Sequence, residues 1–409
     1  MNIRQIIKKI FMLFYYIFRN ILPLNDNVIF FESSVGRNYS SNPKYVYEEM
    51  VMQGLDKEFK CVWSLEDMAT KIPGNAIKVR RTRLKYLYYI SIAKIWVCDT
   101  RLPTFLYKRP ETIYIQLWHG TPLKKLAMDM DVLKMSEGME LSEYQRLFKK
   151  NTQTWDYLIS QSNYTTETFR SCFDFKKQIL NTGFPRNDIL FKKNNKEFIN
   201  SIKNRYNIPK EKKVILYAPT WRDDEFYRNG IYKFSTKLDL NFLKKQLSNT
   251  YVLLVKLHYL VKDPIDWNED DGFVYIFDHL YDIQELYLIS DMLITDYSSV
   301  MFDYSILKRP MIIYSYDYEK YKNQLRGFYF NIFEEFPGPI VETTPELVDS
   351  IKNYDCNKYQ KEYISFLEKF TSFDDGNASS RIVDLILQRN SKISRQNKNE
   401  IYEGELDHE

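Results

Sequence analysis

The 409-residue chain lacks the glycine-rich phosphate loops with which many α/β proteins hold nucleotides. Neither G-x-G-x-x-G nor G-x-x-x-x-G-K-[ST] occurs, and the whole sequence contains only 12 glycines. Dinucleotide and nucleoside triphosphate cradles of these two types are therefore excluded. No G-x-S-x-G is present either, which argues against a serine hydrolase of the nucleophile-elbow type. A phosphate site in this chain would have to be built from other groups.

The chain also has few cysteines and a small net charge, and each of these features excludes some classes of function. The four cysteines form no C-x-x-C pair, so neither a zinc site nor a disulfide framework is indicated, and a reducing compartment is expected. The formal net charge of +4 argues against a nucleic-acid partner. Asp129 and Asp131 form a D-x-D pair that does not directly follow a predicted strand, so no metal or other cofactor is expected.

The N-terminal segment has no apolar run long enough to cross a bilayer. Its uncharged stretch, residues 10–18, is far shorter than the roughly 20 residues needed. Arg4, Lys8 and Arg19 share one face of a helical wheel, with Lys9 as the remaining charge. The other face is apolar and consists of Ile6, Ile10, Leu13, Phe14, Ile17 and Ile21. Residues 1–22 are predicted to form an amphipathic helix in the membrane surface; the alternative is a terminal helix that packs on its own domain.

Short apolar runs alternate with amphipathic stretches, a pattern typical of α/β proteins with parallel, doubly wound sheets. The predicted strands are 28–32, 61–65, 77–79, 95–98, 113–117, 157–160 and 179–181, then 214–217, 251–257, 274–277, 292–295, 311–314 and 340–341. The Lys- and Asn-rich segment 191–213 is predicted to join the two halves. We expect Rossmann-like domains at 23–195 and 196–389, a disordered polar tail at 390–409, and a ligand cleft between the domains.

A phosphate site is predicted where the strand 292–295 ends. Asp296 follows Thr295, and the hydroxyls of Ser298 and Ser299 come just before an apolar segment that looks helical. Backbone N–H groups at the start of a helix can bind phosphate without a metal. An ordinary loop with capping hydroxyls is the alternative for this turn taken alone.

Two of the four histidines stand at the carboxyl ends of predicted strands, one in each half. His119 precedes Gly120 and Thr121, and His258 follows the strand 251–257. Residues in these positions face the crevice of a parallel sheet, so the two imidazoles could meet across one cleft. A neutral His119 could take a proton from an attacking hydroxyl, and His258 could bind phosphate or protonate a leaving group. A structural role is the alternative for either histidine alone.

Four arginines lie beside glycine or in post-strand loops, namely Arg37, Arg186, Arg222 and Arg326. Such loops face the cleft, and the guanidinium group matches phosphate oxygens with two parallel hydrogen bonds. Any one of these arginines could be a solvated loop charge, but four together predict an anionic ligand.

The motifs occur in a fixed order along residues 28–370. They are Gly36-Arg-Asn-Tyr-Ser, Gln116-Leu-Trp-His119-Gly-Thr-Pro, Gly183-Phe-Pro-Arg-Asn-Asp188, Tyr217-Ala-Pro-Thr-Trp-Arg222-Asp, Lys256-Leu-His258, Thr295-Asp-Tyr-Ser-Ser299-Val-Met-Phe-Asp303-Tyr and Arg326-Gly-Phe-Tyr-Phe. In combination they resemble the CDP-glycerol glycerophosphotransferase family of bacterial wall teichoic acid synthesis.

The resemblance implies two facing Rossmann-like domains in the GT-B arrangement, peripheral attachment to the cytoplasmic face of the bacterial cell membrane, and metal-independent transfer of an alditol phosphate. It implies His119 as the general base on the acceptor hydroxyl. We predict His258 as the second catalytic residue, which would also hold the diphosphate. The donor-binding residues that we predict are Arg222, Thr295, Asp296, Ser298, Ser299 and Arg326, and the acceptor or cleft residues are Arg37, Asn38, Gly120, Thr121 and Arg186.

We therefore expect a CDP-glycerol glycerophosphotransferase that uses a lipid-linked saccharide acceptor, releases CMP and needs no cofactor. A CDP-ribitol enzyme, or a capsule polymerase with a similar donor, is the nearest alternative. A second is a two-domain glycosyltransferase that moves a sugar without phosphate. A third is a non-catalytic scaffold that keeps the fold.

Overall fold

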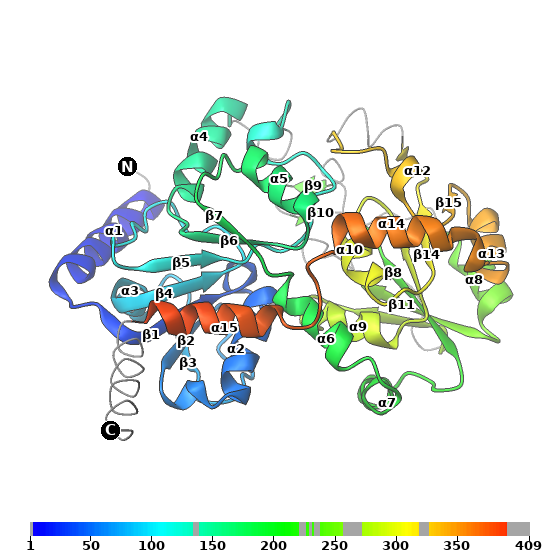
Figure 1. Cartoon of the computed structure of the whole chain (residues 1–409), viewed down its shortest axis with the longest axis horizontal. Coiled ribbons are helices and arrows are strands. Elements are labelled where there is room, and N and C mark those ends of the chain that lie inside the picture. The colour runs from blue at the N-terminus through cyan, green and yellow to red at the C-terminus, as the bar shows by residue number, and fades with distance from the viewer. Residues whose placement is uncertain are drawn as a thin grey trace, which may run out of the picture.

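The computed structural model describes residues 3–133, 139–220, 226–228, 231–232, 238–256, 272–318 and 327–390. Two parallel sheets lie side by side along the long axis of the molecule, each with helices on both faces (Figure 1). The predicted α/β class with two Rossmann-like domains is confirmed.

The first sheet has seven strands in the order β3-β2-β1-β4-β5-β6-β7. Its strands are β1 (Asn25–Glu32), β2 (Lys60–Leu65), β3 (Ile77–Arg80), β4 (Ala93–Cys98), β5 (Ile113–Gln116), β6 (Tyr157–Ser160) and β7 (Gln178–Asn181). The order reverses direction between β1 and β4, so a crevice opens at the carboxyl ends of these two strands.

The second sheet has six strands in the order β12-β11-β8-β13-β14-β15, which repeats the same winding. Its strands are β8 (Lys213–Ala218), β11 (Tyr251–Lys256), β12 (Val274–Phe277), β13 (Met292–Thr295), β14 (Met311–Tyr314) and β15 (Ile340–Val341). A separate antiparallel pair is formed by β9 (Phe226–Arg228) and β10 (Ile231–Tyr232). Here the reversal lies between β8 and β13, so the second crevice forms beside Ala218 and Thr295.

The strands pair because both of their faces are apolar. Each sheet separates two clusters of buried side chains, one on either face. The covering helices are α2 (Ser41–Met52), α3 (Leu84–Ile92), α4 (Leu141–Thr152), α5 (Asn163–Cys172), α6 (Asp188–Lys192), α7 (Lys196–Arg205), α8 (Leu240–Leu247), α9 (Ile283–Ile289), α10 (Val300–Ser305), α12 (Ile332–Glu335), α13 (Thr344–Lys352) and α14 (Gln360–Phe370). Every predicted strand appears in the sheets, and inner strands such as β4 and β13 are buried on both faces.

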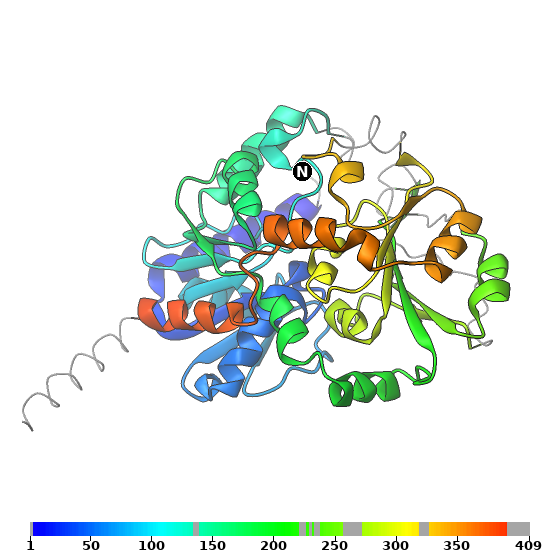
Figure 2. The same cartoon turned by 45° about the vertical axis from the view of Figure 1, so that its right-hand side comes forward.

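The last helix, α15 (Ala378–Arg389), crosses back to the first sheet (Figures 1 and 2). Its Ile382 and Ile386 are buried in the same cluster as Trp63 of β2. Asp188 fixes the start of the helix, because its carboxylate accepts hydrogen bonds from the N–H groups of Ala378 (3.0 Å) and Ser379 (2.7 Å). The domain division predicted from the sequence placed residues 196–389 in the second domain and did not predict that α15 packs on the first.

The N-terminal helix α1 (Ile3–Ile21) packs on the first domain through one stripe and exposes another. Tyr15 is 2% exposed, and its hydroxyl donates to the carbonyl of Tyr107 at 2.7 Å. Phe11, Phe18 and Leu22 contact the same core. Exposed apolar side chains cover the other stripe: Ile6, Ile10, Leu13, Phe14, Ile17 and Ile21.

The charged face of α1 differs from the expectation. Arg19 turns toward the body of the domain and donates to the carbonyl of Lys108 at 3.5 Å, since it shares the helix side that carries Tyr15. Lys9 is exposed, and the side chains of Arg4 and Lys8 lie outside the described part. No helix among the described residues combines the length and apolarity that crossing a bilayer requires.

Candidate active site

His119 lies in the turn that leaves β5, and side chains from distant segments hold the backbone of this turn. Trp118 has a φ of +47°, which is strained for an aromatic residue. Its N–H donates to the Gln116 side chain at 2.9 Å, and its carbonyl accepts from the Asn42 amide at 2.9 Å. The carbonyl of His119 accepts from Nη1 of Arg186 at 2.7 Å. These bonds fix where the imidazole points.

The imidazole of His119 is arranged as a neutral base. Its Nδ1 lies 2.8 Å from the carbonyl oxygen of Asp99, which can only accept, so Nδ1 carries the proton and Nε2 keeps a lone pair. The ring stacks on Trp118 at 4.4 Å. Burial, opposed by the Asp99 hydrogen bond and assisted by the charges of Arg186 and Arg101, lowers the pKa of His119 to about 4. By surface area His119 is nonetheless exposed, and it lines the cleft, so it can meet a substrate.

The second domain presents the turn of Ser298 and Ser299 to this histidine loop. A Cβ atom on Gly120 would lie only 3.1 Å from Oγ of Ser299, so the two loops touch across the cleft. The Ser299 hydroxyl makes no hydrogen bond to any described residue and caps no helix N–H. Helix α10 begins at Val300, as expected, but has only six residues. The serine hydroxyls, rather than the dipole of a long helix, are therefore the main groups with which this turn could hydrogen-bond a phosphate.

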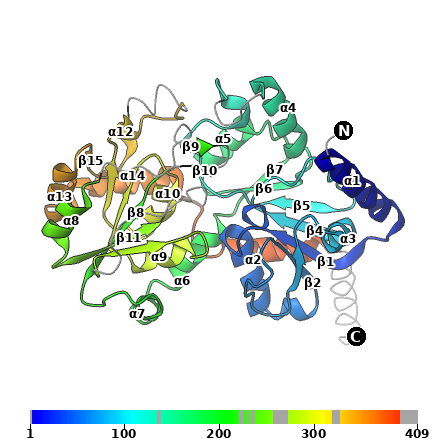
Figure 3. The same ribbon diagram turned by 180° about the vertical axis from the view of Figure 1, so that it is seen from behind.

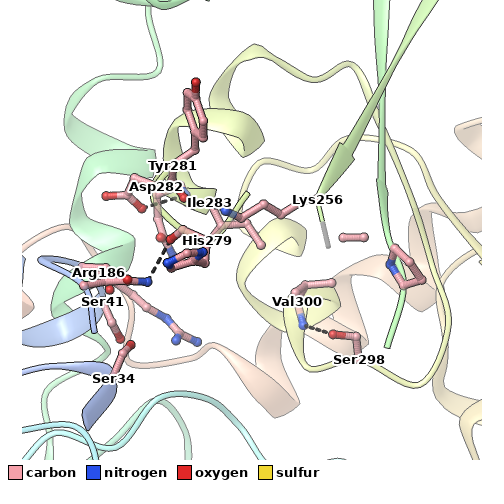
Figure 4. A pocket seen from close by; sticks show the side chains of 15 residues that line it. Ser34, Ser41, Arg186, Lys256, His279, Tyr281, Asp282, Ile283, Ser298 and Val300 are labelled. Carbon is pink, nitrogen blue, oxygen red and sulfur yellow. Dashed lines mark hydrogen bonds between the residues drawn. The ribbon is translucent and has the colours of Figure 1, made fainter. Parts of the chain in front are cut away.

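Two adjoining cavities flank Ser298. The first, here called the His119 cavity, has a volume of about 280 Å³ and is lined by His119, Thr220, Ser298 and Ser299 among others. The second, here called the Lys256 cavity, has a volume of about 250 Å³ (Figure 4). Because Ser298 and Pro219 line both, one extended ligand can occupy the two cavities and pass Ser298 on the way.

Contacts between the domains close one side of the Lys256 cavity. The Asn38 amide donates to the carbonyl of His279 at 2.8 Å. Asp282, at the start of α9, pairs with Lys44 at 2.5 Å and accepts from the Tyr45 hydroxyl at 2.9 Å. Loops from both domains thus form the cavity wall (Figure 4).

Lys256 supplies the cation of the cavity that bears its name. Its ammonium group lies at the end of β11 and donates to the carbonyl of Tyr281 at 2.8 Å. Burial lowers the pKa of Lys256 to about 8, while the nearby Asp282 and Asp278 carboxylates oppose the shift. An anionic ligand in this cavity would stabilise the charged form of the ammonium.

A buried ion pair joins the domains directly beneath the site. Nη2 of Arg186 lies 2.6 Å from a carboxylate oxygen of Asp303, and the two residues are 8% and 2% exposed. The other carboxylate oxygen accepts from the Asn187 amide at 3.1 Å. Burial raises the pKa of Asp303, and the charge of Arg186 opposes that rise. Arg186 thereby links the backbone of His119 to α10, the helix that follows Ser299.

A second branch of hydrogen bonds returns to the histidine loop. The Asn187 amide also reaches Asp374 at 3.4 Å, and the Gln161 amide donates to Asp374 at 2.5 Å. Gln161 then accepts from the Thr121 hydroxyl at 2.6 Å. We call this closed set the interdomain ring; its members are His119, Thr121, Gln161, Arg186, Asn187, Asp303 and Asp374.

The other predicted site residues have varied positions. Thr295 and Asp296 are buried and hold the end of β8, through the carbonyl of Ala218 (2.8 Å) and the N–H of Thr220 (2.8 Å) respectively. Arg37 lies in the same turn as Asn38, beside the Lys256 cavity. The predictions for His258, Arg222 and Arg326 lie outside the described residues.

The D-x-D carboxylates have separate protein partners. Asp129 accepts from the hydroxyls of Ser171 (2.6 Å) and Tyr329 (2.8 Å), whereas Asp131 pairs with Lys125 at 2.7 Å. In the part of the chain that the structure describes, no three potential ligands gather into a metal site.

Several residues that shape the site were not singled out from the sequence. Asp99 could have been, because it directly follows the buried strand 95–98. Gln161 likewise follows β6. Asp374 carries no such signal, since it lies between two helices and reaches the site only through the fold.

Comparisons with known proteins place the chain in a family. Residues 14–388 match the family described as CDP-glycerol:poly(glycerophosphate) glycerophosphotransferase. The chain is 43% identical to the teichoic acid poly(glycerol phosphate) polymerase of Bacillus spizizenii (strain ATCC 23059 / NRRL B-14472 / W23), over 95% of this chain and 98% of the relative. It is 46% identical to the teichoic acid glycerol-phosphate transferase of Staphylococcus aureus (strain NCTC 8325 / PS 47), over 89% and 94%.

Structural comparison gives the same relationship. A solved variant of the wall teichoic acid polymerase TagF, soaked with CDPG, matches with a TM-score of 0.87 at 43% identity over 93% of each chain. A poly(ribitol-phosphate) polymerase of B. spizizenii is more distant, at 31% identity over 94% of this chain and 60% of the relative. The similarity therefore favours the glycerol-phosphate branch over the ribitol branch.

Asp99 should make stability depend on pH. Its carboxyl group is 1% exposed, Oδ1 accepts from the Ser34 N–H at 2.9 Å, and Oδ2 has no partner among the described residues. Burial raises its pKa to about 7, so the folded protein holds this proton where the unfolded chain has lost it. The contribution of Asp99 to the free energy of unfolding should therefore fall as pH rises from about 4 to about 7.

The Asp99→Asn variant lacks this proton but keeps an acceptor for Ser34. Its free energy of unfolding, relative to wild type, should increase with pH across that window and then level off. Urea denaturation of both proteins at steps between about pH 5 and pH 8 measures the difference. Parallel curves for the two proteins would contradict the prediction.

Gly120→Ala should impair turnover by separating the two loops. The residue has a φ of +154°, and the added methyl group would meet Ser299 Oγ at 3.1 Å and Arg186 Nη2 at 3.4 Å. Forcing such contacts costs about 1–3 kcal/mol, so kcat/KM should fall about fivefold or more. Gly54→Ala is the control, because Gly54 also has a positive φ (+77°) but no atom within 4 Å of the new methyl group. Equal activity losses in the two variants would reject a specific effect at the cleft.

Proposed function

This chain belongs to the CDP-glycerol:poly(glycerophosphate) glycerophosphotransferase family, and we propose that it transfers glycerol phosphate from CDP-glycerol to a hydroxyl of a membrane-anchored acceptor, releasing CMP. One observation carries the proposal. His119, whose Nε2 keeps a lone pair, lines the same cavity as Ser299, whose hydroxyl has no partner among the described residues. A base and a phosphate-binding group thus lie on opposite sides of one reaction space.

The donor is proposed to lie across Ser298. Its cytidine end would fill the Lys256 cavity, and its glycerol end would fill the His119 cavity, since these two cavities meet at Ser298 and Pro219. The diphosphate would then pass the hydroxyls of Ser298 and Ser299. The predicted phosphate ligands His258 and Arg326 would complete this grip, and Arg222 would approach from the loop after β8.

His119 would act as general base. The acceptor hydroxyl donates its hydrogen bond to Nε2 and attacks the phosphorus atom that bears the glycerol. Its proton passes to Nε2, the bond to the bridging oxygen breaks, and CMP leaves with the electron pair. The Asp99 carbonyl supports this step because it stabilises the developing imidazolium through Nδ1–H. As in other phosphoryl transfers, the remaining groups position the reactants and offset negative charge.

The enzyme is proposed to work at the cytoplasmic face of the membrane, held by α1. The exposed stripe of this helix is apolar, and the stripe opposite fastens it to the first domain. A surface of this kind can lie among lipid headgroups without crossing the bilayer. An acceptor anchored in the same membrane would then reach the cleft from the first domain.

His119→Ala should remove the base while leaving donor binding intact. General-base catalysis typically contributes about 10²–10⁴ in rate, so CMP release with acceptor present should fall at least that far. Binding of CDP-glycerol, measured by calorimetry, should remain close to wild type, and circular dichroism should confirm the fold. Because burial lowers the pKa of His119, the acid limb of the wild-type rate profile should lie below the ordinary histidine value of about 6.5. Near-wild-type turnover of the variant would reject the base assignment.

Charges on the exposed stripe of α1 should weaken membrane binding. Leu13 and Ile17 are 58% and 37% exposed, so Leu13→Glu with Ile17→Glu should not disturb the core. Losing two apolar contacts worth about 1.5–3 kcal/mol each should lower affinity for anionic liposomes more than about tenfold. Turnover with a soluble acceptor should be unchanged. Tyr16→Glu, on the same helix but outside the stripe, is the control; equal liposome binding by all three proteins would refute the membrane role.

A further inference from the structure

We propose that a strip on the first domain, formed by Arg101, Tyr107, Tyr144 and Lys150, binds phosphate groups of the acceptor between the membrane surface and His119. The strip consists of the loop after β4 and one side of α4, and we call it the α4 strip. The proposal rests on the transferase function proposed above and names the acceptor subsite of that reaction.

Arg101 is an exposed cation that is held in place by aromatic rings. Its guanidinium carbon lies 4.0 Å from the ring centre of Phe148 and 5.6 Å from that of Tyr144. No carboxylate of a described residue lies within ion-pair distance of it. Stacking leaves the N–H edge of a guanidinium free, and that edge matches the oxygens of a phosphate.

The inner end of the strip lies next to the proposed base. Arg101 is two residues after Asp99, whose carbonyl holds Nδ1 of His119 at 2.8 Å. Adjacent rings make the same connection. The ring of His119 lies 4.4 Å from that of Trp118, centre to centre, and Trp118 lies 6.4 Å from Phe148, the ring beneath Arg101. The charge of Arg101 is also one of those that lower the pKa of His119. A phosphate of the acceptor bound to Arg101 would therefore hold the acceptor hydroxyl close to His119.

The outer end of the strip touches the proposed membrane helix. The Lys150 ammonium lies over the Tyr107 ring at 5.0 Å and 3.2 Å from its hydroxyl. The carbonyl of Tyr107 accepts from Tyr15 of α1 at 2.7 Å. Figures 1 and 3 show α1 at the end of the first domain that is farther from the second domain, and α4 along the upper edge of the first domain between α1 and α5. The strip thus runs from the membrane face to the cleft.

The other two cations of α4 already have carboxylate partners. Lys149 pairs with Asp174 at 2.6 Å, and Arg146 with Glu143 at 3.8 Å. Lys150, like Arg101, has no carboxylate partner among the residues that the structure describes. Both of these cations lie over aromatic rings, which is an arrangement expected of a site for an anion supplied by a ligand. An acceptor made of glycerol phosphate units carries such anions along its length.

The test compares two soluble acceptors that end in the same glycerol hydroxyl, one with preceding phosphodiesters and one without phosphate. In Arg101→Ala with Lys150→Ala, KM for the phosphate-bearing acceptor should rise about tenfold or more, with unchanged KM for CDP-glycerol and for the phosphate-free acceptor. Arg101→Lys should raise KM for the phosphate-bearing acceptor less than Arg101→Ala does, because lysine keeps the charge but not the planar N–H edge. Arg146→Ala, on the same helix, is the matched control and should behave as wild type.

A binding measurement separates this proposal from the proposed function. Calorimetry of a short glycerol phosphate oligomer with wild type and the double variant needs no turnover, so it tests the strip even in a protein that releases no CMP. Weaker binding by the double variant supports the strip. Equal binding of the oligomer by both proteins, or an equal rise in KM for both acceptors, would overturn it. Failure of wild type to release CMP from CDP-glycerol with any acceptor would instead refute the transferase proposal.

Discussion

The buried ion pair between Arg186 and Asp303 is the interaction on which the geometry of the site depends. It joins the two domains at 2.6 Å, where Arg186 and Asp303 are only 8% and 2% exposed. Such a pair contributes little net stability, because desolvation offsets most of the attraction, but removing one partner leaves a buried charge and costs about 3–5 kcal/mol. Its consequence here is positional: the loops of the two domains are held in one particular contact.

The interdomain ring passes that constraint to the reacting groups. Arg186 holds the carbonyl of His119, and Asp303 lies on the helix that begins just after Ser299. The strained backbone of Trp118 and the close approach of Gly120 to Ser299 persist because the ring over-determines them. Base and phosphate-binding hydroxyl come from different domains, so the quality of the site depends on closure. A small error in domain placement would separate them.

The fold and the family could be predicted from the sequence, but much of the site could not. Strands buried on both faces appear as apolar runs, and His119 is recognisable because it ends one of them. The sequence of α15 does not reveal which sheet the helix covers, because an apolar stripe indicates burial but not the partner. Gln161 and Asp374 meet across a long sequence separation, so no local spacing reveals their contact. Arg101 carries no sequence signal of a binding role, because its stacking on Phe148 and Tyr144 exists only in the folded chain. The donor roles of His258, Arg222 and Arg326 stay predictions.

A double-mutant cycle on Arg186 and Asp303, read out as kcat/KM for CDP-glycerol with a soluble acceptor, tests the central claim most directly. If the two residues act together to fix the geometry of the cleft, Arg186→Ala and Asp303→Ala should each lower kcat/KM strongly. The double variant should then have a kcat/KM no lower than that of the less active single variant. Near-ultraviolet circular dichroism would establish that all four proteins are folded. Losses that simply add would contradict the account, because the two residues would then act independently.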